Sequence, residues 1–295
     1  MNSNKIPAES PDFFFVVRNY VDSPLYSGEF ENPNCRIHNY NTTEIRQCFN
    51  QYDEIIMFGD SRTRVLYRVL KGRYDGISQV VDYKMHKKLV EPPFTFYWSI
   101  NFNQTVKTLS GYKNKLDGKS RLVIVGEQLQ WPQLDHLKKI ANCSQSTSRK
   151  NLKTHLRYAK SLIQKLEEYK NFEFLFVSAE SRYDTMAGQK CACCAKWSAE
   201  DWDSLSKYYT ENIRGFFEKF KPKNAMFMET NRITMEYEFD EGKTRQHLMP
   251  DGVHKMNRGP HSKPTEFAPS LKIDSEVVFN YFCNKKFNFE DTCCN

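Results

Sequence analysis

The chain has 295 residues, of which 39% are hydrophobic and 27% are charged, a balance typical of a folded globular protein rather than a fibrous or disordered one. Its formal net charge is +7, but the basic residues are spread along the chain and form no block of the kind that binds nucleic acid. Its apolar stretches are far shorter than the roughly twenty residues of a membrane-spanning helix. The composition therefore predicts a folded domain without nucleic acid as a partner.

The pattern of apolar residues becomes regular only after residue 50. Residues 1–50 are interrupted by prolines, which predicts an irregular N-terminal lead-in that packs on the domain, and residues 51–295 are predicted to form that one domain. Within it, short apolar runs indicate buried strands and apolar residues at helical spacing indicate helices. In chain order these are strands over 54–58, 121–125, 172–178 and 225–228, and helices over 61–70, 148–169, 201–220 and 275–282.

Short apolar strands that alternate with long helices predict an α/β fold around a parallel sheet. The strands are apolar throughout rather than alternating, which is typical of a sheet covered by helices on both faces. Ligands of such sheets bind beyond the carboxyl ends of the strands. The residues that follow 58, 125, 177 and 228 are therefore the places at which a site is expected.

The first of these places holds Gly59, Asp60 and Ser61 at the start of a predicted helix. Gly59 is expected to permit a sharp turn and to leave room beside the serine. Ser61 would lie at the positive end of the helix, which favours an oxyanion. From position alone, Ser61 as a nucleophile and Asp60 or Ser61 as a simple N-cap are equally good interpretations. The patterns of phosphate-binding loops are absent.

A serine nucleophile needs an oriented base, and histidine is the usual one. Of the seven histidines, His155 is expected on the surface of its helix. His254 follows Asp251 by three residues in a turn-rich stretch, so both side chains are expected on one side of the turn. Asp251 would orient the imidazole of His254, which would take the proton of Ser61. These three residues are the candidate catalytic triad.

The nine cysteines cluster in loop-like or terminal segments, where disulfides commonly staple irregular chain. Buried thiols and a metal site are the alternatives, although the spacing in Cys191-Ala192-Cys193-Cys194 does not fit a zinc knuckle. We therefore favour disulfides and expect no metal. Because nine is odd, at least one thiol stays unpaired or binds another chain. Asn-x-Ser/Thr sequons at Asn41, Asn103 and Asn142 are compatible with a lumenal setting.

At this point the sequence resembles a known family. Gly59-Asp60-Ser61 and the stretch from Asp251 to His254 resemble the corresponding motifs of the SGNH (GDSL-like) hydrolase superfamily. Within that superfamily, the chain resembles the PC-esterase branch. More narrowly, it resembles the lumenal catalytic domain of the sialic acid O-acetyltransferase family. The stretches that carry the resemblance are 58–64, 122–131, 251–254, 281–285 and Cys293-Cys294. The resemblance implies a three-layer α/β/α, flavodoxin-like SGNH fold with a parallel sheet, an SGNH-like catalytic domain over 51–295, and Ser61, His254 and Asp251 as nucleophile, base and orienting acid.

One departure from the superfamily pattern concerns the oxyanion. Many members carry an asparagine after the middle strand, but here residues 125–131 read Val-Gly-Glu-Gln-Leu-Gln-Trp. The backbone N–H of Ser61 is expected to donate to the oxyanion, with Gly126 or Gln128 as a second donor, and Gly126 as a plain strand-ending turn is an equal alternative. Trp131 is a candidate for stacking on a sugar or base, against the alternative of a core position. Arg62 and Arg64 are candidates for binding substrate phosphates, and for one of them we favour a solvated helix charge.

The resemblance implies an O-acetyltransferase that moves an acetyl group from acetyl-CoA, by way of acetyl-Ser61, to a hydroxyl of sialic acid or CMP-sialic acid. The alternatives are a carbohydrate O-acetyl esterase, a non-catalytic glycan-binding domain on the same fold, and a metal-dependent hydrolase, for which no His/Asp cluster is evident. Residues 1–5 lack the pattern of a signal peptide, which leaves a cytosolic protein or an excised part of a longer one. The family implies a lumenal domain of the secretory pathway, in the Golgi, that precedes a multi-pass membrane region, and a standalone secreted or lumenal protein whose leader has been removed fits equally well.

Overall fold

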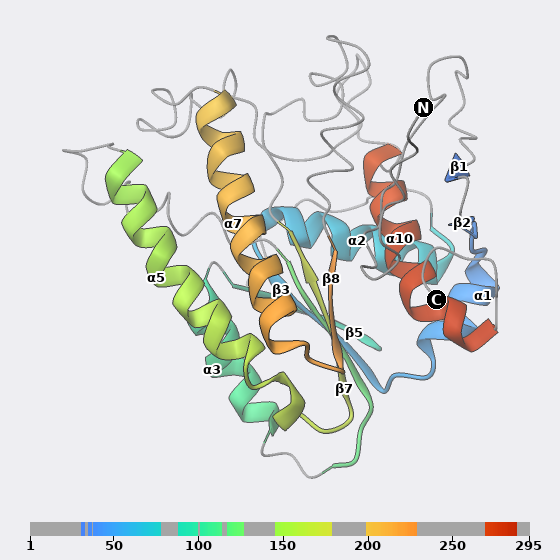
Figure 1. The fold of residues 1–295 in the computed structure, drawn as a ribbon. Helices are drawn as coiled ribbons and strands as arrows, with labels where there is room; N and C mark the ends of the chain where they lie inside the picture. The colour runs from blue at the N-terminus through green and yellow to red at the C-terminus, as the bar shows by residue number, and fades with distance from the viewer. Residues whose placement is uncertain are drawn as a thin grey trace, which may run out of the picture.

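The computed structural model centres on a six-stranded sheet (Figure 1). It describes residues 31–32, 35–36, 38–77, 88–99, 101–113, 117–126, 145–178, 199–228 and 269–287. The strands are β3 (Glu54–Gly59), β4 (Lys88–Glu91), β5 (Phe94–Trp98), β6 (Arg121–Val125), β7 (Phe172–Val177) and β8 (Ala225–Met228). Their order across the sheet is β4-β5-β3-β6-β7-β8. All neighbours pair in parallel except β4, which forms an antiparallel edge with β5.

The order of the strands determines where a ligand site is expected. From β3 the chain crosses to β5 on one side and then returns to β6 on the other, so the direction of winding reverses at β3. This is the order of flavodoxin-like sheets with one added edge strand, and such sheets bind ligands at the reversal point, beyond the carboxyl ends of the strands. The residues after Gly59 and Val125 lie at that point.

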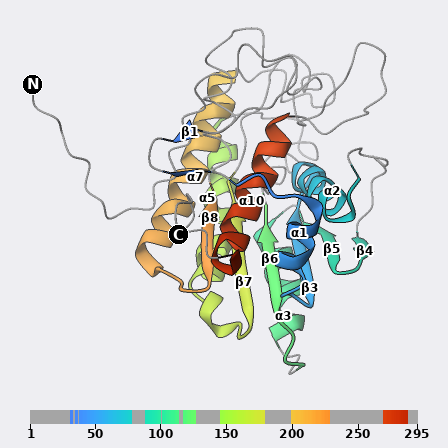
Figure 2. The ribbon, with the colours of Figure 1, turned by 90° about the vertical axis from the view of Figure 1, so that its right-hand side faces the viewer.

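Helices cover both faces of the sheet. One face carries α1 (Thr42–Phe49), α2 (Ser61–Asp75) and α10 (Pro269–Phe287), with α10 in front of the sheet in Figure 2. The other carries α3 (Phe102–Lys113), α5 (Gln145–Ile163), followed by a 3-10 turn over Leu166–Glu168, and α7 (Ala199–Phe220). The expected three-layer α/β/α architecture with a parallel sheet is therefore confirmed. No helix within the described ranges is long and apolar enough to span a bilayer.

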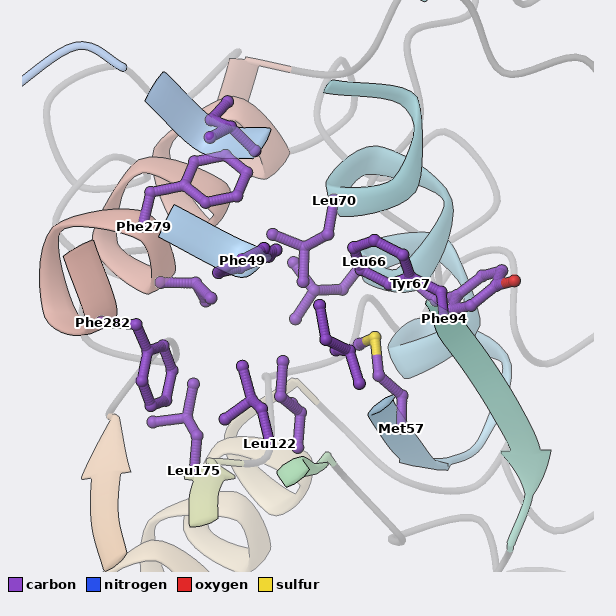
Figure 3. Packing of buried hydrophobic residues seen from close by; sticks show 14 of the residues in the cluster. Phe49, Met57, Leu66, Tyr67, Leu70, Phe94, Leu122, Leu175, Phe279 and Phe282 are labelled. Carbon is purple, nitrogen blue, oxygen red and sulfur yellow. The ribbon is translucent and has the colours of Figure 1, made fainter. Parts of the chain in front are cut away.

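Two apolar clusters hold these layers together. Side chains of a strand point alternately to its two faces, so Ile55 and Met57 of β3 enter the cluster under α2 and α10. Figure 3 shows Met57 in this cluster. Ile56 and Phe58 enter the cluster under α3, α5 and α7. Both faces of the strand are thus buried from Ile55 to Gly59, which explains the unbroken apolar run from Ile55 to Phe58.

Several elements were not predicted. Strands β4 and β5 and helix α3 occupy a region for which no element was proposed. The N-terminal lead-in also contains regular structure, because α1 and the short pair β1 (Glu31–Asn32) and β2 (Cys35–Arg36) fall within residues 1–50. Helix α1 begins at an Asn41–Glu44 capping box.

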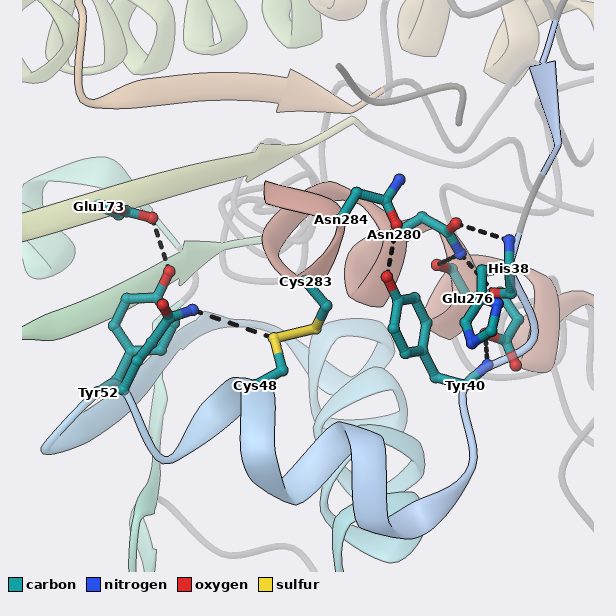
Figure 4. Close-up of a disulfide and its surroundings, with 10 residues drawn as sticks. His38, Tyr40, Cys48, Tyr52, Glu173, Glu276, Asn280, Cys283 and Asn284 are labelled. Carbon is teal, nitrogen blue, oxygen red and sulfur yellow. Dashed lines mark hydrogen bonds between the residues drawn. A yellow bond between two sulfur atoms is a disulfide. The ribbon is translucent and has the colours of Figure 1, made fainter. Parts of the chain in front are cut away.

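A disulfide joins α1 to α10. Cys48 and Cys283 are bonded across a sequence separation of 235 residues (Figure 4). Next to it, the Asn280 side chain accepts from the N–H of His38 and donates to the His38 carbonyl, both at 2.8 Å. The Tyr40 hydroxyl donates to Oδ1 of Asn284. The segment from His38 to Phe49 is therefore integrated into the fold, and the prediction of disulfides is confirmed for this pair.

The position of His155 differs from the prediction. It was expected on the surface of its helix, but it is fully buried, with its ring centroid 4.7 Å from that of Phe102 and 6.0 Å from that of Tyr209. Burial lowers the pKa of the His155 imidazole to about 3, because an apolar environment disfavours the charged form. His155 is accordingly a neutral core residue at physiological pH.

At the amino end of β6, Arg121 is buried against the carboxylates of Glu54 and Asp117. The hydrogen bond from Arg121 lowers the pKa of the Asp117 carboxyl to about 2 from its ordinary 3.8. A lowered folded-state pKa means that this interaction stabilises the fold above the ordinary value and is lost as the pH falls toward 2. We expect Asp117→Asn to flatten the dependence of folding stability on pH between 3.8 and about 2, measured by urea unfolding. A variant with the wild-type slope would contradict this assignment.

Candidate active site

Ser61 lies at the reversal point of the sheet. It is the first residue of α2 and is separated from the last residue of β3, Gly59, by Asp60 alone. Strand β3 is flanked by β5 and β6, so Ser61 stands at the carboxyl edge of the sheet between those two strands. The prediction that a strand over 54–58 leads directly into a helix at Ser61 is therefore confirmed.

The N-cap of α2 is Asp60 and not Ser61. Oδ1 of Asp60 accepts from the backbone N–H of Arg62 at 2.9 Å, and Oδ2 lies 3.2 Å from Nη2 of Arg62. Both side chains are buried. An N-cap side chain satisfies one of the unpaired N–H groups of the first turn, and here Asp60 fulfils that role. The Ser61 hydroxyl is thus not needed for capping, and the predicted N-cap at this turn is Asp60.

The Ser61 hydroxyl has no hydrogen-bond partner among the residues that the structure describes, although the residue is only 5% exposed. Buried hydroxyls are normally paired, so an unpaired one is a candidate for a chemical role. The backbone N–H of Ser61 is among the first N–H groups of α2, which precede the first intrahelical hydrogen bond and have no acceptor within the helix. Hydroxyl and N–H therefore both stand at the positive end of α2, where negative charge is stabilised.

Gly126 uses its N–H within the sheet. This N–H donates to the carbonyl of Phe58 at 2.8 Å and so extends the pairing of β3 with β6. Because an amide has one hydrogen, a second oxyanion donor is better sought elsewhere than at Gly126. Gln128, the other candidate, and Trp131 lie outside the described residues.

Thr63 occupies the space beside two glycines, a feature that the sequence analysis missed. Gly59 is the last residue of β3 and Gly126 directly follows the neighbouring strand β6, and a Cβ atom built on either would lie 2.0 Å from Oγ1 of Thr63. Neither glycine has a positive φ, so the expected sharp turn at Gly59 is not what requires glycine there. What the two glycines provide is room for the Thr63 side chain.

Arg62 and Arg64 are both buried, so the expectation of a solvated helix charge at one of them is wrong. Arg62 is paired with Asp60, as described above. The guanidinium carbon of Arg64 lies 5.4 Å from the ring centroid of Trp98, the last residue of β5, in a cation–π arrangement. Arg62 therefore supports the turn, and Arg64 packs between α2 and the neighbouring strand.

Ser99 is a second serine at this edge of the sheet. It follows β5, and its N–H donates to the carbonyl of Gly59 at 2.9 Å. Its hydroxyl lies 3.0 Å from the carbonyl of Asn101 and 2.8 Å from Oγ1 of Thr105. The Ser99 hydroxyl is therefore paired, whereas that of Ser61 has no partner within the described ranges.

The other two members of the predicted triad, Asp251 and His254, lie outside the described residues. The next described element after them is α10, which packs on the same face of the sheet as α2. In the described ranges, no group of three His, Cys, Asp or Glu side chains is placed to hold a metal ion. The described part of the site consists of the turn from Gly59 to Arg64 and its contacts with β5 and β6.

No protein-family model matches the chain, and no curated protein matches it. Among solved structures, it aligns with the crystal structure of a protein from Parabacteroides merdae ATCC 43184 that is described as a GDSL-like lipase. The identity is 12%, the TM-score is 0.43, and the alignment covers 77% of this chain and 95% of that one. The function proposed below therefore rests on the residues of this chain and not on that likeness.

Proposed function

We propose that the chain is a serine-dependent acyl-transfer enzyme in which Ser61 is the nucleophile. The observation that carries the proposal is the buried Ser61 hydroxyl at the N-terminus of α2, which has no hydrogen-bond partner among the described residues and lies in a turn that Asp60 caps. The position at the reversal point of a parallel sheet supports it, since ligands of such sheets bind there. The motif resemblance to SGNH hydrolases supports the same assignment.

In the proposed first half-reaction, the Ser61 hydroxyl attacks the carbonyl carbon of an acetyl thioester while His254 takes its proton and Asp251 orients the imidazole. The tetrahedral oxyanion is stabilised by the N–H of Ser61 and the positive end of α2. The C–S bond then breaks, the thiol leaves with the proton from His254, and acetyl-Ser61 remains.

In the second half-reaction an acceptor hydroxyl attacks acetyl-Ser61, with its proton passing to His254 and then to the Ser61 oxygen. A sugar hydroxyl as acceptor makes the enzyme an O-acetyltransferase, and water makes it an esterase. We propose acetyl-CoA as donor and sialic acid or CMP-sialic acid as acceptor. Support for both comes from the motif resemblance to the sialic acid O-acetyltransferase family.

We further propose that the protein works in an oxidising compartment of the secretory pathway, with the Golgi lumen as the place that the resemblance favours. The disulfide between Cys48 and Cys283 supports this, because disulfides persist in oxidising compartments and are rare in the cytosol. The resemblance also supports a membrane region elsewhere in a longer protein.

The proposal predicts a covalent adduct on Ser61. We expect the wild-type protein to gain the mass of one acetyl group after mixing with acetyl-CoA, and to be labelled by a serine-reactive fluorophosphonate. Ser61→Ala should show neither, because it removes the oxygen that forms the bond. Intact-mass spectrometry measures both adducts, and peptide mapping places them.

Ser99→Ala is the matched control, since Ser99 lies at the same edge of the sheet and its hydroxyl is paired. It should be modified as fully as the wild type. Labelling of Ser61 by the phosphonate without acetylation by acetyl-CoA would replace the proposed donor and favour an esterase. A folded wild-type protein that shows neither adduct would overturn the assignment of Ser61 as a nucleophile.

A further inference from the structure

The Thr63 side chain is wedged between the ends of the two strands that frame the reversal point. Besides the contacts of Oγ1, a Cβ atom built on Gly59 would lie 2.4 Å from Cβ of Thr63, and one on Gly126 would lie 2.5 Å from its Cγ2. Separations below about 3 Å essentially never occur between real Cβ atoms and non-bonded heavy atoms of other residues. Thr63 thus packs directly against the backbone of both strands, closer than any other residue type at 59 and 126 would allow.

We infer that Thr63 is a positioning residue for Ser61, an inference that rests on the function proposed above. Ser61 and Thr63 belong to the same first turn of α2, in which the N–H of Arg64 donates to the carbonyl of Asp60 at 3.0 Å. This hydrogen bond holds the residues of the turn together, so they move as one. The depth to which the Thr63 side chain enters the space beside the two glycines therefore sets the distance of Ser61 from the carboxyl ends of β3 and β6.

The shape of Thr63, rather than its polarity, performs this role. Its hydroxyl has no hydrogen-bond partner in the part of the chain that the structure describes, although the residue is only 3% exposed. A β-branched side chain has few χ1 rotamers in a helix. It therefore acts as a rigid spacer that resists displacement of the turn toward the strands or away from them.

Misplacement of a reacting group by about 1 Å costs as much as 100-fold in rate. A change in the volume of the Thr63 side chain should therefore slow the chemical step at Ser61 without weakening the binding of a reagent. This separates a positioning role from simple core packing, which lowers stability and leaves the reactivity of the folded protein unchanged.

The test measures the rate constant of inactivation by the fluorophosphonate, kinact, and the dissociation constant of the reversible complex, KI, on folded protein. Thr63→Ala removes Oγ1 and Cγ2 and should lower kinact about 10- to 100-fold with KI unchanged. Thr63→Val keeps the branched shape and should retain a kinact close to wild type. The matched control is Thr210→Ala on α7, where the threonine is also buried and its hydroxyl also lacks a partner within the described ranges. It should leave kinact unchanged.

A second pair of variants tests the contact itself. Gly126→Ala should lose labelling and thermal stability together, because its methyl group overlaps Thr63. Adding Thr63→Gly to Gly126→Ala should raise the melting temperature again and restore labelling to the level of Thr63→Gly alone. A Gly126→Ala protein with wild-type stability and labelling would show that the space is not tight and would overturn the inference.

The two proposals fail in different ways. If the wild type is not labelled at all, the proposed function fails and the positioning role fails with it, whatever the melting temperatures show. If the wild type is labelled but Thr63→Ala reacts as fast, Ser61 remains the nucleophile and only the positioning role is wrong. A slow Thr63→Val would overturn the argument from shape.

Discussion

Cys48→Ala/Cys283→Ala is expected to lower the free energy of unfolding by about 2 to 5 kcal/mol relative to the oxidised wild type, with a value near the upper end. The bond closes a loop across 235 residues, and in the chain-entropy account the loss grows with the length of the closed loop. Both cysteines are fully buried in the cluster under α2 and α10, so the bond also fixes the packing of α1 against α10.

Urea unfolding of the oxidised proteins measures this difference directly. Alanine is preferred to serine because a serine hydroxyl at either position would be buried and would add a desolvation cost of its own. The single variants Cys48→Ala and Cys283→Ala should each lose as much as the double variant, because either one removes the whole bond. Equal stability of the double variant and the wild type would show that the disulfide does not constrain the fold.

The core strands were predictable because their sequences carry a local signal. The strands β3, β6, β7 and β8 are short apolar runs, which is the pattern of strands covered on both faces. Strand β5 is mainly aromatic, and its partner β4 is a half-exposed edge strand whose apolar and charged residues give no clear pattern. The position of β4 depends on its pairing with β5, and the sequence of β4 alone does not indicate this contact.

The site was predictable only in part for a related reason. Ser61 was found because a serine between a buried strand and a helix is a local pattern. The role of Thr63 depends on Gly126, which is distant in sequence and becomes a neighbour only when β3 pairs with β6. The burial of Arg62 and Arg64 was missed because charged residues are rarely buried unless they have partners. Those partners, Asp60 for Arg62 and the Trp98 ring for Arg64, are visible only in the fold.

The burial of His155 predicts a loss of stability in mild acid. Its pKa in the folded protein is lowered to about 3, whereas the unfolded chain has the ordinary value of 6.5. Below pH 6.5 the unfolded chain therefore takes up a proton that the folded protein does not, and each further pH unit costs about 1.4 kcal/mol. The stabilisation is complete above pH 6.5, and about 3 kcal/mol of it is lost between pH 6.5 and pH 4.

His155→Leu should remove this dependence, because leucine has no proton to gain and suits the apolar contacts with Phe102 and the α5–α7 interface. The measurement is the free energy of urea unfolding of both proteins from pH 7.5 to pH 4. Above pH 7, the difference in the free energy of unfolding between the two proteins gives the cost of repacking the core. The change in that difference below pH 6.5 gives the contribution of the proton taken up by His155. Asp117 contributes only at lower pH, since its stabilisation is lost between 3.8 and about 2. If the free energies of unfolding of the two proteins fell in parallel from pH 6.5 to pH 4, His155 would take up its proton in the folded state. The assignment of His155 as a neutral core residue would then be wrong.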